Sequence, residues 1–415
     1  MHYFFQFSGI HAFLVGLLPF FLPTVLWQKG YSLTEIAVFI ALSGVSYLVT
    51  LVVWEVLRSG KGSVWSVRAS FLTEILLVAG LFFFQQQTGN DNTGLVLLAI
   101  LNGVYGCFYW MAQRLLFKSI SHSRNSGQHF GNFQILVAVL LKVGIISGAF
   151  LLEQSSYSAL FMLSSLISLV GIAQTFRHKV LSDINSAFSA PAVRFSQVLR
   201  FRDGYGSRGV FFADGLFLFL ESYFWTLSLY FINSESLLEL GGMMVILAVA
   251  VAALFKLVQT FIDRIAAIRL LRVAIMLYAF SWLLRGLVDD TMATGLQYTV
   301  ILVVAFLTSL FRLSFNKVFF DRADKTTTHA YLLLKSYCSQ LGVAVLFGVI
   351  ALLMTQGFVL HQGQPPLEAL QAVYFVSSIL ALVYFRYSWQ TQSQAARTDR
   401  RIKEIERKGD SYHAY

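Results

Sequence analysis

The sequence predicts an all-α, polytopic membrane protein with twelve transmembrane helices. Three features of the sequence support this fold class. Of the 415 residues, 57% are hydrophobic and only 13% are charged, whereas a soluble domain carries roughly 25% charged residues. The apolar residues form long stretches, and basic residues gather in every second loop. Because a membrane core offers the backbone no hydrogen-bonding partners, each stretch is expected to be helical.

The apolar stretches are long enough to cross a hydrocarbon core, which takes about 20 residues of helix. Twelve segments qualify, and they span residues 4–26, 34–57, 67–86, 94–117, 130–152, 157–176, 208–232, 237–262, 268–287, 293–316, 331–355 and 367–387. Two of the connections between them are short hairpins, around 153–158 and 289–295. An even number of spans places both chain ends on the same side of the membrane.

The distribution of Lys and Arg predicts which side this is. Basic residues concentrate in loops 2–3, 4–5, 6–7, 8–9 and 10–11 and in the C-terminal tail, whereas the opposite loops carry acidic residues such as Glu153 and Asp289. The positive-inside rule then places both termini in the cytoplasm, and we expect the protein in a bacterial cytoplasmic (inner) membrane. Topology accounts for the net charge of +10, so no nucleic-acid partner is expected.

The longest internal connection divides the chain. Residues 177–207 contain Pro191, several Ser and several basic residues. This linker separates an N-terminal six-helix bundle (1–176) from a C-terminal six-helix bundle (208–388), which is followed by a basic tail (389–415). Within the linker, residues 193–202 mix apolar and basic residues, which is compatible with a short amphipathic helix on the membrane surface or with a tether between two bundles.

The length, the six-plus-six arrangement, the inside termini and the basic central loop resemble the major facilitator superfamily. That family marks loop 2–3, and often loop 8–9, with a Gly-x-x-x-Asp-Arg-x-Gly-Arg/Lys-type motif. In loop 8–9, Ile262-Asp263-Arg264-Ile265 through Arg269 is similar to it. In loop 2–3, the segment Glu55-Val56-Leu57-Arg58-Ser59-Gly60 occupies the matching place but lacks the Asp-Arg pair. The resemblance implies gating roles for Asp263, Arg264 and Arg58.

The resemblance also implies an architecture and a mode of action. Two pseudo-symmetric bundles would surround a central cavity, substrate would bind near the midplane, and access would alternate by rocking of the bundles. Helices 1, 4, 7 and 10 would line the cavity. In this family helix 5 packs on helix 8, and the small-residue pair Gly144 and Gly148 on helix 5 is expected to permit such close packing.

Polar residues form stripes on the helices that would line the cavity, because spacings of three, four or seven place side chains on one helical face. The stripes comprise Ser8 and His11 on helix 1, Asn102, Tyr105, Tyr109 and Gln113 on helix 4, Asp214, Glu221 and Trp225 on helix 7, and Ser309, Arg312 and Asn316 on helix 10. We predict that these stripes line a cavity. The residues predicted to bind substrate are Asn102, Tyr105, Tyr109, Gln113, Trp225, Arg312 and Asn316, together with Lys142, Lys256 and Lys335 on other spans. The alternative is that they form hydrogen bonds between packed helices.

Charged groups inside membrane spans are costly and usually face a bundle interior or water. The candidates are Lys142, Lys256, Arg312 and Lys335 among the cations and Glu74, Asp214 and Glu221 among the acids. This cationic excess indicates an anionic or zwitterionic substrate. Glu55, Arg114 and Arg285 lie near helix ends, from which long side chains reach the interface, and they are not included.

A proton-coupled transporter needs a group that can be neutralised within the membrane. Glu221 and Asp214 are the main candidates, with Lys142 or Arg312 as the partner whose pairing competes with substrate. Glu74 is a further candidate, and His11 is one because histidine titrates near physiological pH. Alternatively, these charges form static buried ion pairs that fix helix packing.

The sequence therefore predicts a secondary active transporter of a small organic solute, coupled to protons and acting as a monomer among membrane lipids. A lipid or lysolipid flippase on the same fold and a non-transporting scaffold or sensor are the alternatives. Enzyme motifs are not evident, and we expect no cofactor and no metal site. The absence of a nucleotide-binding sequence argues against an ATP-driven pump within this chain.

Overall fold

The computed structural model describes most of the chain. The described residues are 2–59, 62–87, 92–120, 126–154, 156–201, 203, 205–262, 265–289, 291–324, 326, 328–357 and 365–388. The predicted basic tail lies outside them, and so do two of the predicted gating residues, Asp263 and Arg264.

The N-terminal half contains the first six predicted spans. Its helices are α1 (His2–Leu17), η1 (Pro19–Phe21), α2 (Leu22–Gln28), α3 (Leu33–Ser59), α4 (Ser63–Gln86), α5 (Asn92–Ile120), α6 (Ser126–Glu153) and α7 (Tyr157–Gln174). The first span is divided into α1, η1 and α2 because Pro19 and Pro23 each remove a backbone donor and cannot continue a regular helix. The linker then forms two short helices, α8 (His178–Ala187) and α9 (Phe195–Arg200).

The C-terminal half contains the remaining six spans. Its helices are α10 (Ser207–Phe219), η2 (Leu220–Phe224), α11 (Trp225–Ile232), α12 (Leu237–Ile262), α13 (Ala267–Leu287), α14 (Thr294–Asp324), α15 (Thr328–Thr355), α16 (Pro366–Leu380) and η3 (Ala381–Tyr384). Across the described residues, twelve helices are long and apolar enough to cross a membrane. The predicted number of spans and the all-α class are thus confirmed.

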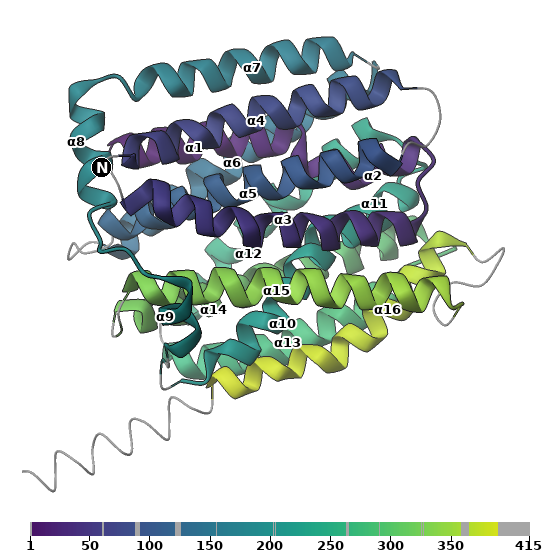
Figure 1. Cartoon of the computed structure of the whole chain (residues 1–415). Coiled ribbons are helices and arrows are strands. Elements are labelled where there is room, and N and C mark those ends of the chain that lie inside the picture. The colour runs from purple at the N-terminus through teal and green to yellow at the C-terminus, as the bar shows by residue number, and fades with distance from the viewer. Residues whose placement is uncertain are drawn as a thin grey trace, which may run out of the picture.

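The long helices run side by side, with the purple-to-blue N-terminal helices in the upper part of Figure 1 and the green-to-yellow C-terminal helices in the lower part. Two helix pairs make the most extensive contacts between the halves. The helix α3 packs along α15 and α6 packs on α12, and Figure 1 shows α3 and α15 adjacent along the seam. Both linker helices lie at one end of the bundle, called here the linker end.

Glycines let backbones approach closely at equivalent places in both halves. In the N-terminal half, a Cβ on Gly144 or Gly148 of α6 would collide with backbone carbonyl oxygens of α1. In the C-terminal half, a Cβ on Gly215 of α10 would collide with the backbone of α15, and one on Gly342 of α15 with that of α10. The pairing α1–α6 therefore has its counterpart in α10–α15, as expected for repeated bundles.

The prediction for the partner of Gly144 and Gly148 was wrong. The helix α6 does pack on α12, the eighth span, but both glycines face α1 instead. The contact with α12 is made by Gly241, which lies against Ala149 and Ile145. One helix has several faces, and a small-residue pair in a sequence does not show which neighbour its face meets.

The outward faces of the bundle are apolar. On α12, the side chains of Ile246, Val249 and Leu257 are 70%, 67% and 77% exposed, and many further Leu, Val and Phe side chains on other spans are exposed too. A water-soluble monomer rarely exposes a contiguous apolar surface larger than a few hundred Å². The fold therefore requires a lipid environment.

Candidate functional site

Four charged side chains from four elements meet inside the C-terminal half. They form the charged cluster, which consists of Asp214 (α10), Glu221 (η2), Arg312 (α14) and Lys335 (α15). Arg312 is at its centre. Its Nε and Nη2 donate hydrogen bonds of 2.9 Å each to the two carboxylate oxygens of Glu221, and its Nη1 donates one of 2.6 Å to Oδ1 of Asp214. A planar guanidinium is suited to this bidentate geometry, whereas an ammonium is not.

Two tyrosines and the lysine complete the contacts of the carboxylates. The hydroxyl of Tyr384 donates a 2.6 Å hydrogen bond to Asp214 Oδ1, and Lys335 Nζ lies 3.6 Å from Oδ2 of the same carboxylate. The hydroxyl of Tyr278 donates to Glu221 Oε1. Both acids are therefore held by a cation and by a phenol.

The two acids differ in access. The side chain of Asp214 is 0% exposed, whereas those of Glu221 and Arg312 are 17% and 18% exposed. Glu221 also lies in η2, a single π-helical turn within the seventh span. Such turns are rare and occur frequently at functional sites. The geometry thus makes Glu221 the acid that water, a proton or a solute can reach, and Asp214 the buried anchor of Arg312 and Lys335.

Arg285 is a buried cation that was not among the predicted site residues. It lies in the last turns of α13 and is 2% exposed. It donates to Ser281 Oγ (2.9 Å) and to Thr308 Oγ1 (2.8 Å), and its guanidinium carbon lies 4.2 Å from the ring centre of Trp282 and 5.1 Å from that of Trp225. Because Arg285 lies near a helix end, its side chain was expected to reach the membrane–water interface. In the structure the side chain points into the bundle.

A stack of aromatic rings occupies the N-terminal half. The imidazole of His11 is stacked between Phe71 and Tyr109, with centroid distances of 4.3 and 4.5 Å, and Tyr105 is stacked on Tyr109 at 5.9 Å. His11 Nε2 shares a 2.9 Å hydrogen bond with Ser70 Oγ. His11 is 0% exposed and is not among the contacts of the charged cluster.

Glu74 lies between two helices of the N-terminal half. Ser164 Oγ and Ser168 Oγ of α7 donate to its carboxylate oxygens at 2.5 and 2.6 Å. It is 0% exposed and, among the described residues, forms no ion pair within 4 Å. Glu74 therefore joins α4 to α7, and the structure does not bring it to Arg312.

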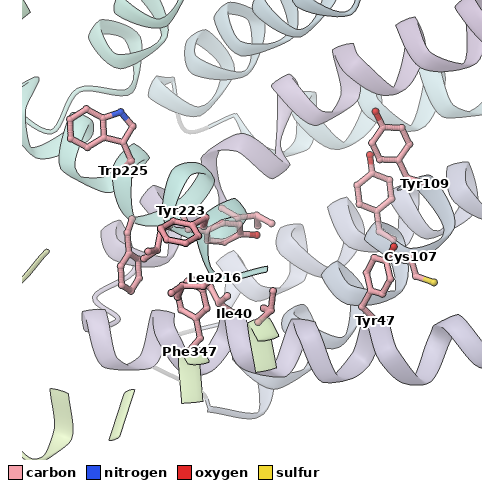
Figure 2. Close-up of a cluster of buried hydrophobic side chains, with 14 of the residues drawn as sticks. Ile40, Tyr47, Cys107, Tyr109, Leu216, Tyr223, Trp225 and Phe347 are labelled. Carbon is pink, nitrogen blue, oxygen red and sulfur yellow. The ribbon is translucent and has the colours of Figure 1, made fainter. Parts of the chain in front are cut away.

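Two residues of the predicted polar stripe on α5 form side-chain hydrogen bonds, Asn102 with other helices and Gln113 within α5 itself. Asn102 Nδ2 donates at 3.2 Å to Ser43 Oγ and at 3.2 Å to the hydroxyl of Tyr223, so this residue joins the two halves. Gln113 Nε2 donates at 3.1 Å to the hydroxyl of Tyr109. Figure 2 shows Tyr223 and Tyr109 at opposite sides of the close-up.

Like the residues of the α5 stripe, four further predicted substrate residues lie outside the hydrogen bonds and ion pairs of the charged cluster. Lys142 is half-buried on α6, Lys256 is exposed on α12, and Asn316 is half-buried one turn beyond Arg312 on α14. Trp225 packs instead against Tyr374, with a centroid distance of 5.9 Å, and against Arg285. Their predicted binding roles stay predictions.

The predicted gating residue Arg58 ties α3 to the linker. It is 1% exposed, and its Nη2 lies 2.5 Å from Glu55 Oε1. It also donates to backbone oxygens of Phe188, Ala190 and Pro191 at 3.0, 2.7 and 3.2 Å. Glu55 in turn pairs with His329 Nε2 of α15 at 3.0 Å. Neither Glu55 nor His329 was among the predicted site residues. Both lie near helix ends, where the sequence does not show whether a side chain is buried or reaches water.

Two hollows lie apart from the charged cluster. One, of about 380 Å³, is lined at the linker end by Arg58, Asn185 and neighbours. The other, of about 460 Å³, is lined by Gln28, Glu153, Glu235 and neighbours. Side chains of the cluster line neither of them, so chemistry and not the size of a hollow identifies the candidate site.

No protein-family model matches the sequence, and no curated protein is detectably similar to it. Solved structures do match. A point mutant of the nucleoside transporter NupG shares 13% identity over 93% of this chain and 98% of its own, with a TM-score of 0.65. Unmutated NupG shares 12% over the same proportions, with a TM-score of 0.62. A bacterial homologue of the human drug peptide transporters PepT1 and PepT2 shares 13% over 96% and 99%, with a TM-score of 0.57.

These matches cover nearly the whole of both chains, so they define the architecture. The chain has the fold of the major facilitator transporters, as the sequence predicted.

Proposed function

We propose that this protein is a secondary active transporter that moves a small organic solute by alternating access, with Glu221 as the proton-coupling carboxylate. The observation that carries the proposal is the geometry of Glu221. It lies in a π-helical turn, it is partly accessible, and it is held by Arg312 and Tyr278. The transporter fold supports the same conclusion.

The coupling step follows from the hydrogen bonds of Arg312. When Glu221 takes a proton from water, its charge is neutralised and the bidentate pair with Arg312 is weakened. Arg312 stays in place because Asp214, which is buried and also held by Tyr384 and Lys335, keeps its third bond. The N–H groups that faced Glu221 become available to a solute. Return of the proton to water re-forms the pair and expels the solute.

The halves contact each other away from the charged cluster as well. Gln28 Nε2 donates at 2.9 Å to the hydroxyl of Tyr230 across the seam, at the end remote from the linker, and His329 meets Glu55 at the linker end. Alternating access requires that one set of such contacts opens while the other closes. The chain thus has contacts at both ends that can serve as gates. The membrane in which we propose that it acts is the bacterial inner membrane.

The test is proton movement in liposomes that contain purified protein and a pH-sensitive dye. Solute gradients are imposed one at a time, beginning with nucleosides and dipeptides because the similar solved structures are of a nucleoside transporter and a homologue of peptide transporters. We expect a solute-dependent proton flux in the wild type that Glu221→Gln abolishes. The matched control is Glu239→Gln, since Glu239 is exposed at the start of α12.

Three outcomes contradict the proposal in different ways. Coupled flux that persists in Glu221→Gln removes this residue from coupling. Movement of lysolipids alone would indicate the flippase. Absence of flux in the wild type with every solute and lipid would indicate the scaffold or sensor.

A further inference from the structure

Arg114 links the two halves beside the charged cluster. It belongs to α5 in the N-terminal half, and its Nη1 donates a 2.5 Å hydrogen bond to Ser336 Oγ of α15. Ser336 directly follows Lys335 on α15, so this hydrogen bond places the guanidinium of Arg114 beside the residue next to that lysine. Two cations from opposite halves therefore face one region, and like charges so placed repel each other.

The carboxylates in this region do not balance its cations. Glu221 is bonded to Arg312, and Asp214 serves both Arg312 and Lys335. In the part of the chain that the structure describes, Arg114 has no carboxylate within 4 Å. Three cations thus share two acids.

Two further facts enlarge the imbalance. Arg285, which is buried near Glu221, has only hydroxyl and aromatic partners among the described residues. Lys335 is 7% exposed, and its carboxylate partner Asp214 is shared with Arg312; a buried cation is costly unless it is fully compensated. The proposed coupling step removes one negative charge more when Glu221 is protonated. An anion entering the region supplies the missing negative charge.

The surroundings enclose this region towards the linker end. One turn beyond Arg114 on α5, Lys118 pairs with Asp324 of α14. Beside that pair, the rings of Phe117 and Phe320 lie 4.8 Å apart. These contacts close the seam, and an anion between Arg114 and Lys335 would lie just inside the closure and touch both halves.

We propose that the transported solute is an anion, carrying a carboxylate or phosphate, and that Arg114 and Lys335 bind its charged group across the interface of the halves while Arg312 completes the site. This inference rests on the proposed transport function and deepens it. Because protonation of Glu221 and anion binding each favour the other, the two are taken up together. Such coupling is reciprocal by thermodynamic necessity.

The experiment measures ligand stabilisation of the detergent-purified full chain with matched neutral and anionic probes. The pairs are uridine with uridine 5′-monophosphate, glucose with glucose 6-phosphate, and N-acetylalanine amide with N-acetylalanine, and inorganic phosphate is compared with chloride at equal ionic strength. Ligands that bind the folded state raise the melting temperature by mass action. We expect the anionic member of at least one pair to stabilise the wild type more, and more strongly at acidic than at neutral pH.

Substitutions then locate the site. Loss of a charged hydrogen bond should weaken anion binding by at least about tenfold in Arg114→Gln, whereas Arg114→Lys keeps the charge and part of the affinity. The control is Arg177→Gln, which changes an exposed arginine at the start of the linker. Equal shifts in the wild type and Arg114→Gln for every probe, including no shift at all, would overturn the proposal.

The result is separable from the test of transport. If neutral probes alone drive coupled flux in liposomes, the transporter proposal holds and the anion site fails. If Arg114→Gln loses anion binding while no probe drives flux, the anion site holds and the transporter proposal fails.

Discussion

Asp214→Asn and Glu221→Gln should separate stability from coupling, although both remove one charge from Arg312. Asp214 is fully buried and is the only carboxylate within 4 Å of Lys335 among the described residues. Removing one partner of a buried ion pair costs about 3–5 kcal/mol, because the remaining charge is left uncompensated. Asp214→Asn leaves the buried Lys335 without its carboxylate partner, so we expect the free energy of unfolding to fall by about 3–5 kcal/mol.

Glu221→Gln should cost less. Its two hydrogen bonds with Arg312 are charge-assisted, and such bonds contribute about 1.5–3 kcal/mol each. The glutamine oxygen can keep one of them in weaker form, Arg312 retains Asp214, and the side chain is 17% exposed so that water compensates in part. We therefore expect a net loss of about 2–3 kcal/mol.

The assay is unfolding in detergent followed by tryptophan fluorescence, in parallel with proton flux in liposomes. Asp214→Asn should unfold at the lower temperature or denaturant concentration, and Glu221→Gln should be the more stable variant yet lack coupling. Tyr384→Phe, which removes one hydrogen bond from Asp214, should lie between wild type and Asp214→Asn. If Glu221→Gln is instead the less stable of the two acid variants, burial does not set the cost of removing a carboxylate here.

Three further expectations concern packing and the linker. Gly215→Ala should destabilise the protein by about 1–3 kcal/mol through overpacking against α15, whereas Gly209→Ala in the same helix meets nothing within 4 Å and should be neutral or stabilising; equal melting temperatures would contradict this. Arg58→Ala should speed proteolytic cleavage between α8 and α9, since it removes three bonds to linker carbonyls; an unchanged cleavage rate would count against a latch there. Ser168→Ala should cost about 1–3 kcal/mol by depriving a buried carboxylate of a donor, with Ser165→Ala as control because the Ser165 hydroxyl has no hydrogen-bond partner among the described residues; similar unfolding of both variants would argue against the Ser168–Glu74 bond.

Much of the fold was predictable because a bilayer imposes a simple rule on sequence. Each span must be helical and apolar over about 20 residues, so twelve apolar segments separated by polar loops predicted twelve helices, and the structure has them. The ends were less predictable. The tenth span continues to Asp324, eight residues past the predicted 316, since its polar last turns are stabilised by contacts that a hydropathy pattern does not contain.

The candidate site was predictable only where helical spacing sufficed. Asp214 and Glu221 were identified because seven residues separate them on one helix, and Arg312 because it lies on another helix expected at the cavity. Their pairing depends on the approach of α10, η2 and α14, and the unequal access of the two acids depends on a π-helical turn. Spacing along one helix carries no information on either point.

The sequence by itself determined that the protein lies in a lipid bilayer, how many helices cross it, and that cations outnumber acids inside these spans. Tertiary structure decided which charges meet. Arg285 and Arg114 lie near helix ends, where long side chains can reach water or turn inward, and only the packed neighbours select between these courses. In this chain Arg285 packs inside the bundle against the rings of Trp225 and Trp282, and Arg114 donates a hydrogen bond to Ser336 of the other half. The linear sequence thus shows which charges the spans contain. Which of them pair depends on contacts between helices that are far apart in the sequence.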